Sequence, residues 1–373
     1  MKMLAFWKLI ALICAVSWFT PAAAEEIAIG CYIPITGSAA AMGQVVWKGI
    51  QTARRLKPQV LGQKISLKLV DTKSDRIEAA NAVSRLIEKD KVVAIIGEVI
   101  SGDTLAGTPI AERLAVPNLT PTATNPLVTQ NRQYAFRVCF VDTQQGRAAA
   151  RFAREYLKVQ KVAVIIDQGQ DYCVGLAAFF MEEFQKLGGQ IVAKTFIQTG
   201  DQDFSAQISA IKPTAPDLVY APNYYAEDAL LARQMRELGF AAPILTGDGA
   251  QVSDLIAIGG AAVEGLYLTA HFHREAVNTP LAQEFIKAYE AETKSEIGAF
   301  AALGGDCYFL LRDALERAQT TKGPKLRQAL AQTKNFPGVS GLITMGPDNN
   351  PIKEVNILKV QGGKFVYVTK LAP

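Results

Sequence analysis

Residues 97–126 read GEVISGDTLAGTPIAERLAVPNLTPTATNP, and this stretch predicts both the sheet and its ligand-binding edge. An apolar strand, residues 92–96, leads into it, and Ser101 and Thr104 begin a helix after the Gly97 turn. A second apolar strand, residues 116–119, ends in a run of threonines. In open α/β sheets, ligands bind at the carboxyl ends of neighbouring strands, and helix N-termini there favour anions. The stretch therefore predicts a site for a small anion.

The rest of the chain alternates short apolar strands with amphipathic helices. Strands are predicted at residues 27–33, 65–70, 162–166, 191–196, 218–221 and 244–246, and helices at 43–56, 76–89, 147–157, 174–187, 204–211 and 226–238. This alternation is typical of βαβ units with parallel sheets. It begins again near residue 147, so the pattern predicts two Rossmann-like α/β lobes.

Three extended stretches, at residues 134–142, 263–272 and 342–348, predict three chain crossings between the lobes. A chain of 373 residues exceeds the usual size of a single hydrophobic core, which also favours two lobes. We expect lobe 1 to hold residues 25–141 and 271–346, and lobe 2 to hold residues 142–270 and 347–373. The crossings would act as a three-segment hinge, with a ligand cleft between the lobes.

The first 24 residues have the pattern of a signal peptide. Lys2 and Lys8 precede an apolar run at residues 9–19, and three alanines follow before Glu25. An uncleaved membrane anchor is the alternative, but the apolar run is too short to span a bilayer comfortably. We expect cleavage after Ala24 and export to the periplasm. Loss of the two lysines lowers the net charge from +4 to +2, and no polybasic run suggests a nucleic acid partner.

The sequence lacks the motifs that nucleotide binding and hydrolysis need. His271 and His273 are its two histidines, no G-x-S-x-G elbow is present, and both nucleotide-binding glycine motifs are missing. The two histidines could form half of a metal site, but we expect a solvated or hydrogen-bonded pair near the hinge, because no third metal ligand lies close in sequence. The prediction is no catalytic residue, no metal and no cofactor.

Four cysteines follow the signal segment: Cys31, Cys139, Cys173 and Cys307. An oxidising compartment permits disulfides, and the sequence does not select among the three possible pairings. Each cysteine is expected to be a small buried residue.

Polar and aromatic residues follow the strands of both lobes. Ser101, Thr122 and Thr124 belong to lobe 1, and three groups belong to lobe 2: Asp171-Tyr172, Tyr224-Tyr225 and Asp248. Each has a structural alternative: Ser101 as a helix N-cap, Thr124 and Asp248 as turn residues, the tyrosines as surface aromatics. Together they put hydroxyl and N–H donors on one wall of the cleft and a carboxylate on the other. That arrangement suits a zwitterion with a carboxylate and an ammonium group.

These residues belong to segments that resemble leucine/isoleucine/valine-type (branched-chain) amino-acid-binding proteins, the type I periplasmic solute-binding proteins of ABC importers. The matching segments are IAIGCYIPITGSAAAMG, TPTATNP, YAFRVCFVDTQQG, DLVYAPNYY and LTGDGA. The resemblance extends over nearly all of residues 25–373. It implies a receptor that closes on an amino acid, delivers it to an inner-membrane ABC permease and acts as a monomer.

The resemblance also implies a role for each site residue. The ligand carboxylate would be bound by Ser101, Thr122, Ala123 and Thr124, and the ammonium group by Asp248, Thr122 and Tyr224. The side-chain pocket would consist of Met42, Val99, Ile100, Tyr172 and Phe300. Asp248 stands where branched-chain proteins commonly have glutamate, and Ser74 and Ile100 replace a disulfide found in some members. The apolar pocket favours an aliphatic or aromatic side chain, whereas Glu98 or Asp103 would favour a polar or basic one if either faced the pocket.

Three other functions are weighed against amino-acid capture. The same fold could bind an amide, urea or an aromatic carboxylate, but such ligands leave the Asp248 carboxylate without a cation. A periplasmic enzyme is disfavoured by the missing nucleophile motifs. A sensor domain is disfavoured because no transmembrane helix or signalling domain follows.

Overall fold

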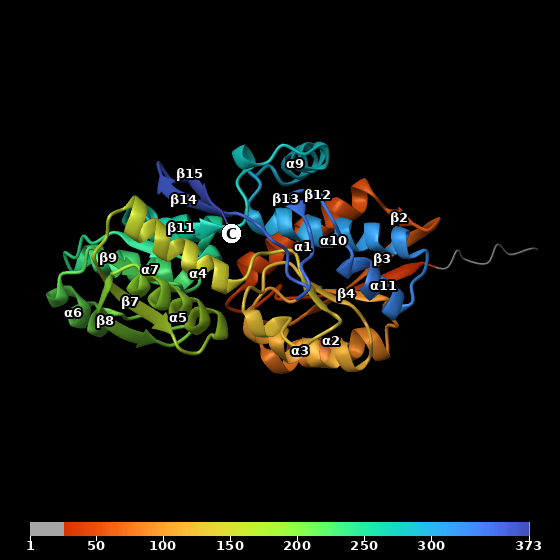
Figure 1. The fold of residues 1–373 in the computed structure, drawn as a ribbon, viewed down its shortest axis with the longest axis horizontal. Helices are drawn as coiled ribbons and strands as arrows, with labels where there is room; N and C mark the ends of the chain where they lie inside the picture. Colours follow the sequence, from red (N-terminus) through yellow and green to blue (C-terminus); the bar gives the residue numbers. More distant parts are fainter. Residues whose placement is uncertain (1–25, 373) are drawn as a thin grey trace, which may run out of the picture.

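The computed structural model describes residues 26–372 and has two α/β lobes lying side by side (Figure 1). The predicted signal peptide, residues 1–24, lies outside the described residues. The two sheets and the segments that connect them place the candidate site residues.

Lobe 1 is built on a six-stranded sheet in the order β2-β3-β1-β4-β5-β6. Its pairs are parallel except for β2 with β3. The strands are β1 (Ile27–Ile33), β2 (Gln59–Val60), β3 (Gln63–Asp71), β4 (Ala94–Gly97), β5 (Asn118–Thr120) and β6 (Ala135–Arg137). The helices are α1 (Ala40–Leu56), α2 (Arg76–Glu88), α3 (Ser101–Arg113), α9 (Pro280–Thr293), α10 (Ala299–Ala318) and α11 (Gly323–Ala331). In Figure 1, α2 and α3 lie on one side of the sheet, and α1 and α10 lie on the other.

Lobe 2 is built on a seven-stranded sheet in the order β15-β14-β11-β10-β9-β7-β8. The strands are β7 (Lys161–Asp167), β8 (Gln190–Ile197), β9 (Leu218–Tyr220), β10 (Ile244–Thr246), β11 (Tyr267–Ala270), β14 (Val355–Gln361) and β15 (Lys364–Leu371). The helices are α4 (Asp142–Arg151), α5 (Asp171–Lys186), α6 (Ser205–Ile211), α7 (Tyr225–Glu237) and α8 (Ser253–Gly259). β14 and β15 form an antiparallel hairpin at the sheet edge.

Three segments connect the lobes. Residues 138–141 lead from β6 to α4, residues 271–279 lead from β11 to α9, and residues 344–354 lead from β13 (Gly341–Ile343) to β14. β13 pairs with β12 (Phe336–Gly338) in a small antiparallel ladder beside lobe 1. We call these three segments the first, second and third crossing. The lobe boundaries expected from the sequence, after residues 141, 270 and 346, fall at or within them.

The structure corrects several predicted elements. α4 begins at Asp142 and α5 begins at Asp171, each before its predicted start, and in α4 the polar residues of the first turn hide the apolar period. Gln145 and Tyr172 are therefore on helices. The β14–β15 hairpin and the helices α9 to α11 were not predicted from the sequence, and the hairpin makes the lobe 2 sheet mixed rather than purely parallel.

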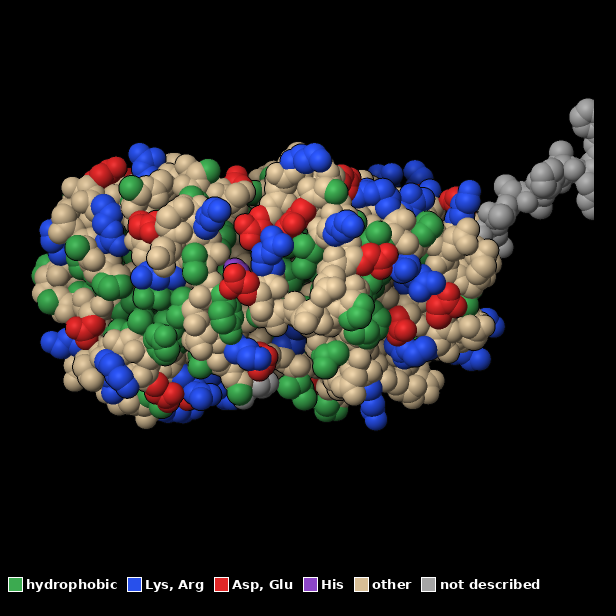
Figure 2. All heavy atoms as spheres, turned by 90° about the horizontal axis from the view of Figure 1, so that it is seen from above, with side chains coloured by type: hydrophobic (Ala, Val, Ile, Leu, Met, Phe, Trp, Pro, Cys, Tyr) green, Lys and Arg blue, Asp and Glu red, His purple; other side chains and the backbone are tan. Residues whose placement is uncertain are grey.

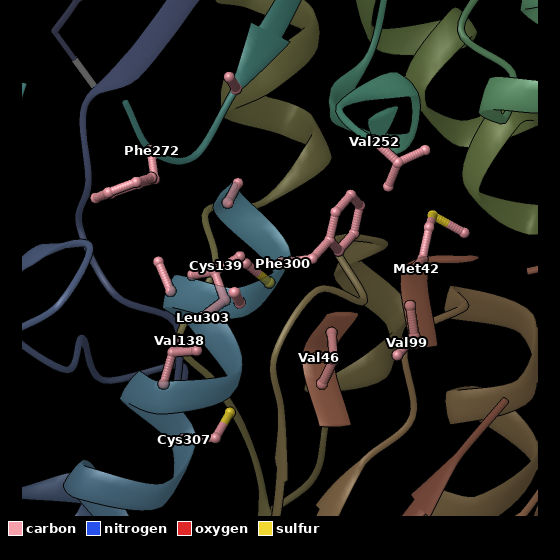
Figure 3. Packing of buried hydrophobic residues seen from close by; sticks show 14 of the residues in the cluster. Met42, Val46, Val99, Val138, Cys139, Val252, Phe272, Phe300, Leu303 and Cys307 are labelled. Atoms are coloured by element: carbon pink, nitrogen blue, oxygen red, sulfur yellow. The ribbon is translucent and has the colours of Figure 1, made fainter. Parts of the chain in front are cut away.

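Close packing of α1 against α10 fixes one wall of the cleft. A Cβ atom at Gly49 would lie 2.2 Å from the carbonyl oxygen of Ala301, so the two helix backbones touch where glycine allows it. Figure 3 shows Met42 of α1 and Phe300 of α10 near each other, with Val252 of lobe 2 above them. All three side chains are buried. The apolar core therefore continues up to the boundary between the lobes.

The four described cysteines carry free, buried thiols, as expected of small core residues. Among residues 26–372 no helix is long and apolar enough to cross a bilayer. Acidic and basic side chains are interspersed over the face that Figure 2 shows.

Candidate functional site

A small cavity lies between the lobes, with about 210 Å³ of unfilled space that is partly open to solvent. Lobe 1 contributes Met42, Val99, Ser101, Thr122 and Phe300, and lobe 2 contributes Tyr172, Tyr224, Asp248 and Gly249. The cavity thus brings together every predicted site residue except Ile100, Ala123 and Thr124. These three are buried in the lobe 1 loops beside it.

On the lobe 1 side, two loops are tied together below the cavity. Thr122 donates its hydroxyl proton to the carbonyl oxygen of Val99 at 2.8 Å, and Ser101 Oγ accepts the N–H of Asn125 at 3.2 Å. Ser101 is the first residue of α3, whose N-cap is Ile100, so the N-cap alternative for Ser101 is wrong. The first turn of an α-helix has N–H groups without intrahelical partners. Because Ser101 lines the cavity, the N-terminus of α3 lies at the cavity wall.

Two of the residues expected at the ligand carboxylate do not line the cavity in this structure. The N–H of Ala123 donates to Thr120 Oγ1 at 3.1 Å, and its carbonyl oxygen accepts from Arg137. Thr124 Oγ1 is buried without a hydrogen-bond partner among the described residues. Ser101 and Thr122 are thus the predicted carboxylate ligands that reach the cavity surface.

Arg137 supports the threonine loop from behind. Its fully buried guanidinium donates to the carbonyl oxygens of Ala123 at 2.7 Å and Asn125 at 2.9 Å. Burial lowers the pKa of Arg137 from its ordinary value, and nearby Cys139 and Asp142 oppose this. A guanidinium stays charged in proteins, so it places a positive charge behind the loop. Arg137 was within a segment quoted for the family resemblance, but its contacts depend on the fold and could not be read from the sequence.

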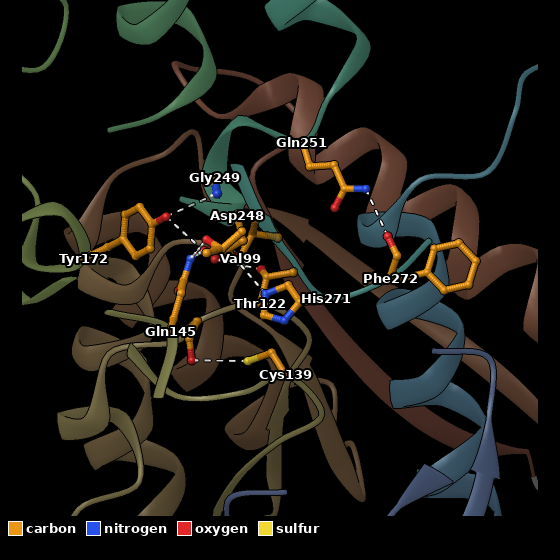
Figure 4. A network of polar contacts seen from close by, with 12 residues as sticks. Val99, Thr122, Cys139, Gln145, Tyr172, Asp248, Gly249, Gln251, His271 and Phe272 are labelled. Carbon is orange, nitrogen blue, oxygen red and sulfur yellow. Dashed lines mark hydrogen bonds and ion pairs between the residues drawn. The ribbon is translucent and has the colours of Figure 1, made fainter. Parts of the chain in front are cut away.

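On the lobe 2 side, the Asp248 carboxylate is the centre of a buried hydrogen-bond network (Figure 4). Its Oδ1 accepts from Gln145 Nε2 at 2.7 Å and from the Tyr172 hydroxyl at 2.9 Å. Its Oδ2 lies 2.8 Å from His271 Nε2. Gln145 also donates to Thr269 Oγ1 at 2.7 Å. Asp248 is therefore held by three side chains as well as by its own short helix, η4 (Asp248–Ala250).

Glycines on either side of Asp248 make room for two tyrosines. A Cβ at Gly247 would lie 2.1 Å from the Tyr172 hydroxyl oxygen, and one at Gly249 would lie 2.9 Å from the Tyr224 ring. The two tyrosine rings stack with centroids 5.2 Å apart. The Gly-Asp-Gly sequence is thus required by close packing against the aromatic wall, which the turn alternative does not account for.

The two histidines have different surroundings. The His271 ring is buried and packs on Phe140 with a centroid separation of 3.7 Å. Burial lowers the pKa of His271, although the neighbouring Asp248 carboxylate acts in the opposite direction. His273 is half-buried, and its Nδ1 accepts the N–H of Glu275 at 3.4 Å. Within the described residues no group of three or more His, Cys, Asp or Glu side chains is arranged to hold a metal ion.

The acids Glu98 and Asp103 do not line the cavity. Glu98 accepts from Thr72 Oγ1 at 2.7 Å and from the N–H of Ile100 at 2.5 Å. Burial raises its pKa well above the ordinary value, and nearby Asp103 adds to the effect. Burial also raises the pKa of Asp103 to about 6. Neither carboxylate is placed to select a basic ligand side chain.

Direct contacts join the two lobes at the rim of the cavity. Arg76 Nη2 of α2 lies 2.8 Å from Asp171 Oδ2 of α5, and Asn125 Nδ2 donates to the Asp171 carbonyl oxygen at 2.9 Å. The Tyr225 hydroxyl donates to the carbonyl oxygen of Ser38 at 3.0 Å. The lobes therefore meet around the cavity, and the structure has the geometry of a closed cleft.

Comparisons with known proteins agree with this geometry. The sequence profile described as "Periplasmic binding protein" matches residues 26–364. Leu/Ile/Val-binding protein homolog 3 of Brucella melitensis is 31% identical over 360 residues, which cover 93% of this chain and 95% of that protein.

Two solved structures are also similar. The leucine-binding protein LivK of Thermotoga maritima is 46% identical with a TM-score of 0.92, and the match covers 93% of this chain and 99% of that one. LivJ of Streptococcus pneumoniae, solved in complex with isoleucine, is 30% identical with a TM-score of 0.89, and the match covers 94% and 100%. The similarity extends over both lobes and the cleft between them.

Proposed function

This chain belongs to the periplasmic binding protein family, and we propose that it captures an amino acid with an aliphatic side chain and delivers it to the permease of an ABC importer. One observation carries the proposal. The buried Asp248 carboxylate faces, across the small cavity, the N-terminus of α3 with Ser101. A negative group and a set of donors on opposite walls suit the ammonium and carboxylate groups of a zwitterion.

The carboxylate of the ligand would bind at lobe 1. Ser101 Oγ, the main chain at Thr122 and the N–H groups of the first turn of α3 would donate to it. Arg137 supports this site electrostatically, because its buried charge lies behind the loop that would surround the anion. Helix N-termini favour anions for the same reason.

The ammonium group would bind at lobe 2, on the Asp248 carboxylate, with Tyr172 and Tyr224 closing over the ligand. The three side chains that contact Asp248 are a glutamine, a tyrosine and a histidine, so no lysine or arginine among them competes with the ammonium group of the ligand. A ligand that carries a carboxylate but no ammonium group would add a second negative charge to this closed site. This disfavours an aromatic carboxylate. An amide or urea is neutral and would leave the buried Asp248 carboxylate without a cation, which disfavours those ligands as well.

The side chain of the ligand would contact Met42, Val99 and Phe300, which are apolar and buried. The cavity that these side chains line is small and partly open to solvent. Its apolar lining by these three residues suits an aliphatic side chain.

Closure of the lobes would couple binding to delivery. The ligand touches both walls only when the cleft is closed, so it stabilises the closed state by its difference in affinity for the two states.

We infer that the protein acts as a monomeric receptor without chemical change of the ligand, and that residues 1–24 direct export and are removed after Ala24. N-terminal sequencing of the exported protein would test the cleavage site, and recovery of unchanged ligand would test the absence of catalysis.

A thermal-shift screen of the twenty amino acids, benzoate, urea and small amides would test the ligand class. A ligand at a hundred times its Kd stabilises the folded protein by about 2.7 kcal/mol. We expect leucine, isoleucine or valine to give the largest shift, followed by titration calorimetry on that ligand. Stabilisation by benzoate or an amide and by no amino acid would contradict the proposal.

A further inference from the structure

We infer that His271 is a positioning residue for the ammonium site: its ring holds the Asp248 carboxylate in place, and a proton on the ring competes with the ligand's ammonium group. The inference rests on the proposed function and deepens it. It makes amino-acid affinity depend on the protonation of one residue that does not line the cavity.

The geometry links His271 directly to the binding acid. Its Nε2 lies 2.8 Å from Asp248 Oδ2, and the side chains of both residues are at most 4% exposed. Gln145 and Tyr172 contact only the other oxygen, Oδ1. His271 is thus the one described side chain that fixes Oδ2, and without it the carboxylate could rotate about its last bond.

The contact also assigns the neutral tautomer of the ring. A carboxylate only accepts hydrogen bonds, so Nε2 carries the proton and donates it. The other ring nitrogen, Nδ1, is buried and has no partner among residues 26–372. A second proton on the ring would therefore sit in a site that offers it no acceptor.

The charges around the ring favour this neutral form. Asp248, on η4, is the negative group that faces it, and Lys353, on the third crossing, is the positive group nearby. Phe140 of the first crossing and Gln145 of α4 are uncharged. Burial is the largest effect and lowers the pKa of His271, Lys353 acts in the same direction, and Asp248 opposes both.

The sign of the expected effect follows from the charges. A protonated ring would form an ion pair with Asp248 and leave no net negative charge for the ammonium group. Binding is therefore strong above the pKa of His271 in the ligand-free protein and weakens as the pH falls through it. One competing proton weakens binding by at most about tenfold per pH unit.

Titration calorimetry with L-leucine between pH 4.5 and pH 8 would test the inference. His271→Gln keeps an amide donor for Asp248 but has no group that titrates in this range, and His273→Gln is the matched control. We expect the affinity of His271→Gln for leucine to fall less than that of the wild type as the pH is lowered. His273→Gln should follow the wild type. Because Glu98, Asp103 and Asp142 also have raised pKa values, the difference between the profiles isolates His271.

A second measurement, an NMR titration of the two histidines, requires no substitution in the binding site. The chain has two histidines, so their imidazole NMR signals can be assigned with the His273→Gln variant. Protonation and leucine binding are linked, so each weakens the other by the same factor. If protonation of His271 raises the Kd for leucine tenfold, saturating leucine should lower the pKa of His271 by one unit. The pKa of His273 should not change. Superimposable pH profiles for wild type and His271→Gln, or no shift of either histidine on adding leucine, would overturn the inference. Absence of binding of leucine, isoleucine and valine by the wild type at pH 7.5 would overturn the proposed function and the inference together.

Discussion

Replacing Asp248 by asparagine removes one negative charge from the cleft and keeps nearly the same side-chain shape. The carbonyl oxygen of the asparagine can still accept from Gln145 and Tyr172, which both contact Oδ1 in the structure. Its amide group would face His271 Nε2, and the neutral ring can move its proton to Nδ1 to accept from it. We therefore expect Asp248→Asn to fold normally and to unfold within about 1 kcal/mol of the wild type.

The loss of ligand affinity should be much larger than the change in stability. The Asp248 side chain is 4% exposed, so an ammonium group on it would form a largely desolvated ion pair. Two unit charges about 4 Å apart attract by about 4 kcal/mol at an effective dielectric constant of about 20. Removal of one partner from a buried, hydrogen-bonded charge pair costs about 2–5 kcal/mol. Since every 1.4 kcal/mol is tenfold, the Kd for leucine should rise by about 30-fold to about 4,000-fold.

Calorimetry with two ligands separates the charge from other effects. The first is L-leucine, and the second is 4-methylpentanoate, which has the same carbon skeleton and carboxylate but no ammonium group. We expect the wild type to bind leucine far more tightly, and Asp248→Asn to lose most of this discrimination. Asp103→Asn is the control, because Asp103 is buried in lobe 1 but does not line the cavity. Wild-type affinity for leucine in Asp248→Asn, or equal losses in the two variants, would refute the ammonium assignment.

Three further changes test other parts of the structure. Arg76→Ala removes the half-exposed ion pair with Asp171 between the lobes, which is worth up to about 1 kcal/mol. The Kd for leucine should therefore rise by up to about fivefold, and by less at high salt. An unchanged Kd at low salt would show that the pair does not stabilise closure. Gly247→Ala puts a methyl group where the Tyr172 hydroxyl lies, so chemical denaturation should show a loss of about 1–3 kcal/mol and calorimetry weaker binding, whereas wild-type values would contradict the predicted clash. The four described thiols are buried, and burial raises the pKa of Cys139 to about 12. A thiol reagent should therefore label none of them in the native protein and all of them after unfolding in denaturant. Rapid labelling of the native protein would contradict their burial.

Local patterns in the sequence predicted most of the elements that carry the site. β1 and β10 have the predicted bounds, and α3 begins at Ser101 as expected. These patterns work because the period of apolar residues and the residues that follow a strand are local properties. The first turn of α4 was missed for the same reason, since its polar residues lack that period.

The partners of the site residues could not be predicted in this way. Gln145 and His271 are far from Asp248 in sequence, and nothing in their own segments indicates that all three meet. Arg137 belongs to one of the segments that carry the family resemblance, but its role depends on the direction of the Ala123 carbonyl group in the threonine loop. Hydrogen bonds of buried groups are chosen by the packing of several elements at once, which no single segment encodes.

The sequence by itself therefore determined two α/β lobes and a threonine-rich strand end in lobe 1, because periodicity and turn residues act locally. It also placed Asp248 between two glycines as the acid of lobe 2. Only the tertiary structure decided that Ser101 and Asp248 share one small cavity, that Ala123 and Thr124 lie behind its surface, and that His271 fixes Asp248 from below. Those outcomes depend on how the three crossings bring the two sheets together, and the free energy of burying a charge or a hydroxyl is set only once its neighbours are in place.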